Sequence, residues 1–369
     1  MKNDMIIKQI KNRILIYGAG AIGRGYLAPL LQKFGMRISF VDKNEKLINE
    51  LKSRKSYKTA VTGINKYEFI NVPVDEAFLF GEKINIEDYD LVFSCVGPNN
   101  CYDLADDIKN AKIIISCEND MGTVGGLKKL TGNPNIYFGI PDVITSNTAP
   151  PNLLADDPLM AVTEKGVLVL EEGSYSLPNE IIQVGPKDLH MHWMCKLFIH
   201  NAPHAIVAYL GWLKGYEYIH EAMADEDINR IVIGSISEIT DGVIAADFSE
   251  KNYANDYKKK ELKRFSNALL YDTIKRVARE PLRKIAYDNR LVLGLRIALF
   301  NGKLPINTAK GLKAALFYGD NSDQEAVYLQ SIRSNTSDSE ILKKFSKIDQ
   351  FEPLNRFIVE QNLSQFLKG

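Results

Sequence analysis

The chain is 369 residues long, with 45% hydrophobic and 25% charged residues, and its 46 basic and 46 acidic side chains give a formal net charge of zero. This composition is typical of a globular protein and excludes a disordered chain. The neutral balance also lacks the excess positive charge of a dedicated nucleic-acid binder. The length favours about two domains, large enough to form cores without disulfides or structural metal ions.

The chain has no signal for a membrane or an oxidising compartment. No stretch approaches the ~20 apolar residues of a membrane span, and Met1–Arg13 is polar and rich in lysine, unlike a signal peptide. We therefore expect a cytoplasmic protein without membrane or nucleic-acid partners. No two cysteines have C-x-x-C spacing, which favours reduced thiols. The cysteines are Cys95, Cys101, Cys117 and Cys195.

Short apolar runs alternate with helix-like segments in the first half of the chain. Apolar residues recur every four positions in Ala21–Phe34, which predicts a helix, and a second helix is predicted at Glu45–Ser53. Strands that alternate with helices indicate βαβ units and a parallel sheet of the doubly wound Rossmann type, an α/β fold. The predicted strands of this sheet are Arg13–Tyr17, Arg37–Asp42, Asp90–Val96 and Lys112–Cys117.

Additional β-structure interrupts this pattern. Tyr57–Thr62 and Tyr67–Val74 have the composition of strands with no helix between them, which predicts an antiparallel insertion. A second β-rich stretch covers Met160–Glu172 and Glu180–Val184. The three prolines of Ser146–Pro158 indicate a connection.

The second half of the chain has helical spacing of its apolar residues and almost no strand signal. We therefore expect an α/β dinucleotide-binding domain at residues 1–188 and an all-helical substrate domain at residues 189–369. The predicted helices of the second domain are Met194–Leu213, Asp225–Ala246, Lys258–Arg279, Thr308–Leu316 and Gln324–Ile332.

A glycine-rich loop, Gly18–Gly25 (GAGAIGRG), joins the first predicted strand to the first predicted helix. In a G-x-G-x-x-G loop the first glycine permits a tight turn, the second lets the backbone approach a pyrophosphate, and the third lets helix and strand pack closely. The start of the helix also offers free N–H groups to phosphates. We therefore predict that a dinucleotide binds at Gly18, Gly20, Ala21, Ile22 and Gly23.

The acidic residue at the end of the second predicted strand indicates which dinucleotide binds. Asp42 lies 19 residues after Gly23, close to the ~20 expected for the carboxylate that binds the ribose 2′-hydroxyl. Such a carboxylate repels the 2′-phosphate of NADP, so we predict NAD as the cofactor, although Lys43 follows directly. FAD uses the same kind of loop, and the glycines alone do not exclude it.

The segment from Lys196 to His204 (KLFIHNAPH) places four polar side chains on one face of a predicted helix. At about 100° per residue, Lys196, His200 and His204 fall within about 80°, and Asn201 lies about 60° from His204. A lysine against a partly dry apolar wall loses its proton more easily, because desolvation disfavours the ammonium form. Such a lysine can act as a general base.

The residues alone leave other interpretations of this segment open. The lysine and the histidines would equally form a solvated polar face. His200 and His204, four residues apart, would suit a metal ion, but no carboxylate accompanies them as in H-E-x-x-H, so we predict no metal site. His190 and His192 have the pattern of ordinary polar positions. Pro203 would remove one hydrogen bond of the helix and bend it.

Taken together, the motifs resemble the polyol-specific long-chain dehydrogenase/reductase family. The resemblance covers most of the chain, and the K-x-x-x-x-N-x-x-H spacing is specific enough to favour a catalytic face over a solvated one. Besides the glycine loop and this spacing, the matching runs are Ser94–Pro98 (SCVGP), Cys117–Asn119 (CEN), Arg279–Ile285 (REPLRKI) and Asp288–Leu291 (DNRL).

The resemblance implies catalytic roles for four residues. Lys196 would be the general base for alcohol oxidation, and His204 would position the substrate. The side-chain amides of Asn119 and Asn201 would polarise the reacting oxygen, in a reaction that uses no metal ion.

The resemblance also implies contacts to the cofactor and to the substrate. Val96 and Gly97 would contact the dinucleotide, and His200 would contact the substrate. Basic side chains with a guanidinium fork suit phosphate oxygens. The residues expected to hold a substrate phosphate are Arg283, Lys284 and Arg290.

The expected function is therefore an NAD-dependent interconversion of mannitol 1-phosphate and fructose 6-phosphate, by a protein that we expect to be monomeric. One alternative keeps the hydride chemistry but changes the substrate to another polyol phosphate or to a sugar acid such as a hexuronate. Another alternative is a dinucleotide-binding sensor without catalysis.

Overall fold

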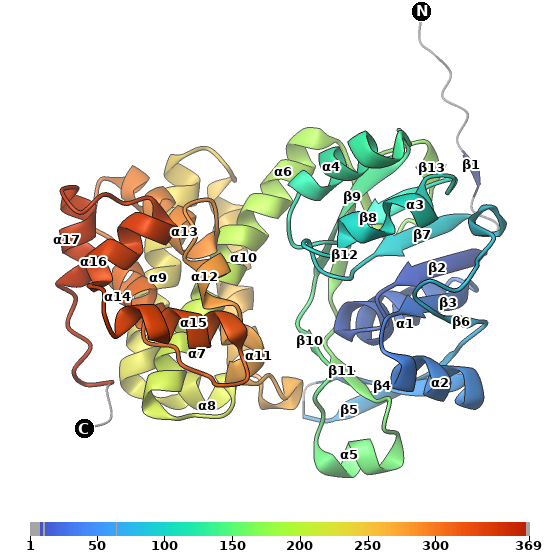
Figure 1. The fold of residues 1–369 in the computed structure, drawn as a ribbon, viewed down its shortest axis with the longest axis horizontal. Helices are drawn as coiled ribbons and strands as arrows, with labels where there is room; N and C mark the ends of the chain where they lie inside the picture. The colour runs from blue at the N-terminus through green and yellow to red at the C-terminus, as the bar shows by residue number, and fades with distance from the viewer. Residues whose placement is uncertain (1–7, 10–11, 64, 367–369) are drawn as a thin grey trace, which may run out of the picture. The chain divides into compact units, whose positions relative to one another are not determined.

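The computed structural model describes residues 8–9, 12–63 and 65–366, so most of the polar segment Met1–Arg13 lies outside the described residues. The chain divides into two compact units (Figure 1). The first extends to Leu189 and includes Leu269–Tyr271, and the second comprises His190–Ala268 and the chain from Asp272 onward. Within the described part, no helix combines the length and apolar character that crossing a membrane requires.

The first unit contains an eight-stranded sheet in the order β14-β12-β9-β8-β7-β2-β3-β6. The six strands from β9 to β6 run parallel to their neighbours, and β12 is antiparallel to β9. The prediction of a Rossmann-type sheet is confirmed. The strands are β2 (Arg13–Tyr17), β3 (Arg37–Asp42), β6 (Ala77–Leu79), β7 (Leu91–Ser94), β8 (Ile114–Ser116), β9 (Ile136–Asp142), β12 (Val167–Glu171) and β14 (Ile182–Val184).

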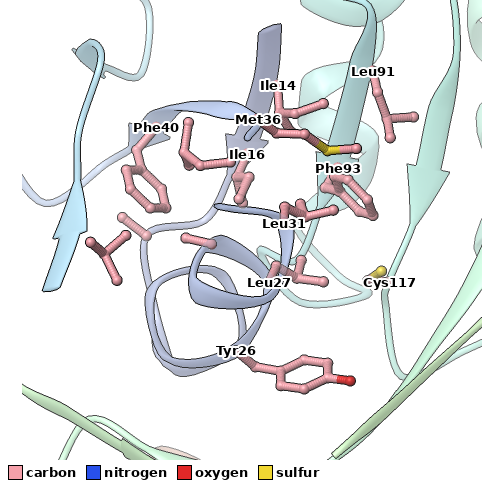
Figure 2. Packing of buried hydrophobic residues seen from close by; sticks show 14 of the residues in the cluster. Ile14, Ile16, Tyr26, Leu27, Leu31, Met36, Phe40, Leu91, Phe93 and Cys117 are labelled. Carbon is pink, nitrogen blue, oxygen red and sulfur yellow. The ribbon is translucent and has the colours of Figure 1, made fainter. Parts of the chain in front are cut away.

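Both faces of this sheet are covered by a hydrophobic core. Successive side chains of a strand point to opposite faces, so each strand contributes to both cores. Ile14 and Ile16 of β2 pack in one core, in which Leu27 and Leu31 of the first helix turn toward them (Figure 2). Leu15 packs in the core on the other face. The helices of this unit that follow the sheet strands are η1 (Ala21–Leu27), α1 (Ala28–Gln32), α2 (Glu45–Arg54), η2 (Ile86–Asp88), η3 (Cys101–Leu104), α3 (Ala105–Ile108) and α4 (Gly122–Thr131).

The predicted antiparallel insertion is confirmed, and it belongs to a larger sheet. Its order is β10-β11-β4-β5, with β4 antiparallel to β5 and parallel to β11. The strands are β4 (Ser56–Thr62), β5 (Tyr67–Pro73), β10 (Thr145–Ser146) and β11 (Ala161–Thr163). A third sheet pairs β1 (Lys8–Gln9) with β13 (Tyr175–Ser176).

The connection predicted at Ser146–Pro158 contains a short helix. The helix α5 (Pro151–Asp156) forms there. Pro151 stands in the first turn of this helix, where its missing N–H has no intrahelical partner to lose and its fixed φ favours the helical conformation. The same residue type that indicated a connection thus starts a short helix.

The second unit is helical, as predicted, and its described residues contain no strand beyond a single bridge between Tyr218 and Thr273. Helix α7 packs against α8, α9, α11 and α14. The helices, coloured yellow-green to red in Figure 1, are α6 (Pro186–Met194, shared with the first unit), η4 (Cys195–Asn201), α7 (Ala202–Lys214), α8 (Ile219–Ala224), α9 (Glu226–Ala245), α10 (Lys251–Phe265), η5 (Ala268–Leu270, also shared with the first unit), α11 (Ile274–Ala278), α12 (Pro281–Lys284), α13 (Arg290–Ala298), η6 (Leu299–Asn301), α14 (Ile306–Ala315), α15 (Gln324–Arg333), α16 (Asp338–Ile341), η7 (Leu342–Ser346) and α17 (Pro353–Val359).

The predicted helix Lys258–Arg279 does not form as one element. Helix α10 ends at Phe265, and α11 begins at Ile274. Between them Tyr271 has a φ of 51°, a left-handed conformation that a right-handed helix cannot include. The Thr273 side chain then accepts a hydrogen bond from the backbone N–H of Arg276 and so caps α11.

The four cysteines are reduced thiols, as predicted. Cys101, Cys117 and Cys195 are buried, and Cys95 is half-buried. Burial raises the pKa of the Cys95 thiol well above its usual value, which keeps the thiol protonated and unreactive.

Candidate functional site

The glycine loop borders a cavity at the carboxyl ends of β2, β3 and β7. Open α/β sheets bind their ligands at this edge. Four predicted cofactor residues, Gly18, Gly20, Asp42 and Val96, line the cavity, whereas Ala21, Ile22, Gly23 and Gly97 do not. The other lining residues are Tyr17, Val41, Lys43, Phe80, Cys95, Asn100, Asp103 and Leu104.

The geometry of the loop requires glycine for the reasons that its spacing suggested. Gly18 has a φ of 96°, and a Cβ atom there would lie 2.6 Å from the carbonyl oxygen of Cys95. A Cβ atom at Gly23 would clash with the carbonyl of Gly18. At Gly20 only the Asn147 side chain would come as near as 4.0 Å, so the backbone there is open to a ligand. These features fit a bound pyrophosphate.

The helix that follows the loop begins differently from the prediction. Ala21–Phe34 was expected to be α-helical, but Ala21–Leu27 forms the π-helix η1, in which the Ala28 N–H donates to the Gly23 carbonyl five residues back. The wider turn coincides with the segment of closely packed glycines. π-Helical segments occur frequently at functional sites.

Asp42 ends β3 with its carboxylate beside the glycine loop. Its two oxygens accept hydrogen bonds from the backbone N–H groups of Ala19, at 2.8 Å, and Asn44, at 2.9 Å. A carboxylate has about four acceptor positions, so both oxygens keep capacity for ribose hydroxyls. The side chain therefore braces the loop and also suits the role predicted from its spacing.

Arg24 is a structural residue of this site to which the sequence analysis assigned no role. Its side chain is 5% exposed, and its Nε donates to the Ala19 carbonyl at 2.5 Å, while Nη1 donates to the Leu159 carbonyl. The Arg24 carbonyl accepts a hydrogen bond from the Tyr57 hydroxyl at 2.7 Å. Arg24 thus ties the glycine loop to the insertion sheet. The sequence did contain a signal for this structural role, namely a charged residue between two glycines of a buried helix.

Glu118 is a second residue that the sequence analysis missed. The carboxylate is 3% exposed and accepts hydrogen bonds from the Ser94 hydroxyl at 2.5 Å, the Val96 N–H at 3.0 Å and the Gly97 N–H at 2.8 Å. Burial raises the pKa of Glu118, and these three hydrogen bonds oppose the shift. The N–H groups of Val96 and Gly97 thus already have an acceptor. Through these hydrogen bonds Glu118 positions the backbone that forms this part of the cavity wall.

Replacing Glu118 by glutamine is expected to weaken NADH binding by about 1–3 kcal/mol. The carboxylate accepts with both oxygens, whereas an amide places an NH₂ group against one of the donors Val96 N–H and Gly97 N–H. Fluorescence titration with NADH measures the effect. Glu82→Gln, which removes a partner of the exposed Lys52, is the control and should bind NADH normally. Equal NADH affinity in both variants would show that Glu118 does not shape the site.

Asn119 follows β8 at the same edge of the sheet and is half-buried. Asn119 belongs to the first unit, whereas Lys196, Asn201 and His204 belong to the second unit.

The lysine–asparagine–histidine face is buried. Lys196 is 9% exposed, and His200, Asn201 and His204 are 5–7% exposed. These values exclude the solvated polar face. Burial also withdraws the Lys196 side chain from most of the solvent.

The helix that carries Lys196 is a π-helix, η4 (Cys195–Asn201), and not the predicted α-helix. In α-helical geometry Asn201 would lie about 140° from Lys196. In a π-helix, hydrogen bonds join residues five positions apart, so residues at this spacing stack approximately one turn above each other. The widened helix therefore brings Asn201 toward the side of the helix that carries Lys196.

Pro203 lies within a helical stretch that continues from η4 into α7. It stands in the first turn of α7, at the junction with the π-helix, where its missing N–H is tolerated. The lost donor coincides with the change from π to α geometry.

Each histidine of this face pairs with a buried carboxylate that the sequence analysis did not identify. His200 Nδ1 lies 2.5 Å from Glu261 Oε2, and His204 Nε2 lies 2.9 Å from Asp272 Oδ2. Glu261 is 61 residues and Asp272 68 residues from its partner, so no local spacing signals the pairing. Among the described residues, no three His, Cys, Asp or Glu side chains are grouped to hold a metal ion.

The basic residues expected at the phosphate are grouped in the second unit. Lys284 and Arg290 are 3% and 7% exposed. Burial, followed by the charges of Arg290 and Arg283, lowers the pKa of Lys284 well below its usual value, and burial with the charge of Arg283 lowers that of Arg290 to about 9. Two carboxylates contact the cluster: Glu280 pairs with the Arg283 side chain at 2.7 Å, and Glu325 accepts a hydrogen bond from the Arg283 backbone N–H at 3.0 Å. Buried cations that repel one another provide a site for an anion.

Glu280 itself has a φ of 57°, the left-handed conformation that is rare for residues other than glycine. Strained backbone of this kind tends to occur at functional sites. Arg283 is partly exposed, and Lys284 Nζ donates to the Arg279 carbonyl. The structure thus brings the predicted phosphate residues together in one cluster. Lys284 and Arg290 are the buried members of this cluster.

Comparison with known proteins supports the resemblance in both halves of the chain. A model of the mannitol dehydrogenase Rossmann domain matches residues 12–131, and a model of the mannitol dehydrogenase C-terminal domain matches residues 188–359. Mannitol-1-phosphate 5-dehydrogenase of Oceanobacillus iheyensis is 30% identical over 94% of this chain and 96% of that protein. The enzyme of the same name from Clostridium acetobutylicum is 29% identical over 94% and 97%.

Solved structures show the same fold. Pseudomonas fluorescens mannitol 2-dehydrogenase, in a ternary complex with NAD and D-mannitol, superposes with a TM-score of 0.72 at 16% identity, covering 95% of this chain and 90% of that one. A substrate-free D-sorbitol dehydrogenase superposes with a TM-score of 0.68 at 17% identity, covering 97% and 93%. Together with the relative at 30% identity, the matches confirm the predicted family and Rossmann domain. The chain therefore belongs to the mannitol dehydrogenase family, a family of oxidoreductases.

Proposed function

We propose that this protein is an NAD-dependent dehydrogenase that interconverts mannitol 1-phosphate and fructose 6-phosphate without a metal ion. The observation that carries the proposal is the burial of Lys196 on a helix that also carries Asn201, His200 and His204. A non-catalytic sensor has no use for this combination. The similarity to relatives named mannitol-1-phosphate 5-dehydrogenase supports the choice of substrate.

The cofactor is NAD, held at the glycine loop. Gly18 and Gly20 line the cavity, and Asp42 offers its carboxylate where a 2′-phosphate would otherwise lie. The solved relative with NAD has the same fold, which supports this assignment. When bound, NAD accepts the hydride that leaves the carbinol carbon of the polyol.

Lys196 takes the hydroxyl proton as the hydride leaves, so that negative charge does not remain on the reacting oxygen. Asn201 donates its amide N–H to this oxygen, and Asn119 serves as a second amide donor. Amide donors and a neutral lysine supply the stabilisation for which other dehydrogenases use a metal ion. His204 positions the substrate through one of its hydroxyl groups, and His200 contributes to substrate binding.

The buried cation cluster binds the substrate phosphate. Arg290 and Arg283 supply guanidinium forks, and Lys284 supplies an ammonium group. A phosphate would relieve the repulsion among these cations, so binding energy is concentrated on the phosphorylated end of the substrate. The same cluster would also accept the carboxylate of a sugar acid.

A comparison of sugars tests the proposal directly. Purified protein with NADH should oxidise the cofactor with fructose 6-phosphate and not with free fructose at the same concentration, as followed by NADH absorbance. Glucuronate and fructuronate, tested in parallel, distinguish the sugar-acid alternative. NADH binding without turnover of any of these substrates would contradict the proposed reaction while leaving the cofactor assignment intact.

A further inference from the structure

Two carboxylates in the helical unit each connect one histidine to one arginine. Glu261 faces His200 with Oε2 and Arg264 with Oε1, both at 2.5 Å. Asp272 faces His204 with Oδ2 at 2.9 Å and Arg276 with Oδ1 at 2.6 Å. Each carboxylate therefore uses one oxygen for the imidazole and the other for the guanidinium.

The two pairs form one packed group. The ring centroids of His200 and His204 are 5.1 Å apart, and both rings contact Phe265, which stacks on His204 at 4.9 Å. Glu261 is fully buried and Asp272 is 4% exposed. Packing of the two imidazoles against each other and against Phe265 limits their rotation, so each ring keeps the same nitrogen toward its carboxylate.

Each carboxylate lies against an arginine, and an adjacent cation favours the ionised form of a carboxyl group. Arg264 contacts Glu261, and Lys260 Nζ lies 3.6 Å from the same oxygen. At Asp272 burial favours the neutral acid, but Arg276 and His204 outweigh it and lower the pKa to about 2. An ionised carboxylate carries no hydrogen, so the nitrogen that faces it must be the donor.

We propose that Glu261 and Asp272 are positioning residues for the family reaction, which fix His200 with its hydrogen on Nδ1 and His204 with its hydrogen on Nε2. The two neighbouring histidines thus hold opposite tautomers. His204 then presents Nδ1 as a hydrogen-bond acceptor, which suits the hydroxyl of a polyol. This last step rests on the proposed function, whereas the tautomers follow from the contacts alone.

Burial favours the neutral imidazole of His204. Burial lowers the pKa of His204, and the charges of Arg276 and Arg264 lower it further against the opposing effect of Asp272. A second imidazolium 5.1 Å away would add repulsion between like charges. When a ring carries one hydrogen, the choice of nitrogen decides which side of the ring donates a hydrogen bond and which side accepts one.

Amide variants test the assigned tautomers, because the neighbouring arginine determines which way the new amide group is oriented. In Glu261→Gln, Arg264 still requires an acceptor, so the amide oxygen turns to the arginine and the NH₂ group faces His200 Nδ1. The hydrogen of His200 must then move to Nε2. Asp272→Asn reverses the tautomer of His204 in the same way, because Arg276 keeps the amide oxygen of the new asparagine as its acceptor.

Two-bond ¹H–¹⁵N correlation spectra of ¹⁵N-histidine-labelled protein distinguish these tautomers. His200→Gln and His204→Gln assign the signals among the five histidines. The wild type should show Nδ1–H for His200 and Nε2–H for His204, and each amide variant should invert its own histidine. Glu238→Gln is the matched control, since Glu238 accepts hydrogen bonds from Asn307 and Thr308 and contacts no histidine.

Several results would overturn the proposal. These are the opposite tautomer on either ring of the wild type, or an unchanged spectrum in a folded amide variant. The wild-type assignment does not depend on any variant folding, and Glu261→Asp provides a milder variant that keeps the carboxylate and should keep the tautomer.

Kinetics provide the functional readout. With fructose 6-phosphate, Glu261→Gln and Asp272→Asn should lower kcat/KM by about tenfold or more and leave NADH affinity unchanged, while Glu261→Asp restores part of the activity. Normal kcat/KM in both amide variants with inverted tautomers would contradict the positioning role. If the wild type fails to reduce any sugar, the proposed reaction fails, and the tautomer spectra still decide this inference.

Discussion

Replacing Lys196 by alanine is expected to lower kcat by about 10²- to 10⁴-fold, the contribution of a positioned general base, while the affinity for NADH stays nearly the same. Lys196 lies on η4 of the helical unit, whereas the residues that line the dinucleotide cavity belong to the first unit. Stopped-flow and steady-state NADH absorbance measure turnover, and fluorescence titration measures NADH binding.

Two comparisons separate loss of the base from loss of structure. Lys251→Ala, at an exposed position at the start of α10, should retain full turnover. A small primary amine added to the Lys196→Ala variant should restore part of the rate, because it can occupy the vacated space and accept the proton. Turnover at neutral pH close to that of the wild type would remove Lys196 as the base.

Replacing Lys284 by methionine is expected to raise KM for fructose 6-phosphate by about 10- to 100-fold, as expected for the loss of one charged hydrogen bond. Methionine fills a similar volume without burying a charge, so the Tm should not fall substantially. Arg283→Ala should raise KM in the same direction but less, because Arg283 is partly exposed and already paired with Glu280. NADH oxidation at varied sugar phosphate concentration measures both changes.

Lys275→Met is the matched control for the phosphate prediction. Lys275 is in the same unit, but its side chain is 64% exposed and faces Asp320. Its replacement should leave KM unchanged. An unchanged KM in both Lys284→Met and Arg283→Ala would contradict a phosphate at this cluster and favour a substrate without one.

The sequence predicted the elements whose signal is local. Strands β2 and β3 have the predicted bounds, because each is an apolar run between turn residues. The spacing of the glycines alone predicted the dinucleotide loop. The structure agrees, since Gly18 and Gly23 occupy positions where a Cβ atom would meet the backbone. The helical character of the second half followed from the spacing of apolar residues. These features depend on residues close together in the chain.

Hydrogen-bond register within helices was not predictable in the same way. A π-helix and an α-helix accept similar residues, so Ala21–Leu27 and Cys195–Asn201 gave no sign of their wider turn. The interruption between α10 and α11 depends on the left-handed conformation of Tyr271, a residue type that does not favour it. Tertiary packing imposes each of these departures.

Residue types and their spacing were enough to identify the family, the dinucleotide loop with Asp42, and the candidate lysine, asparagine and histidine. The surroundings of these residues became clear only from the folded chain. It buries Lys196, pairs His200 with Glu261 and His204 with Asp272, and groups Lys284 with Arg290. The physical reason is that charge state and hydrogen-bond direction depend on desolvation and on partners brought together by folding, and those partners lie 61 and 68 residues away for the two histidines.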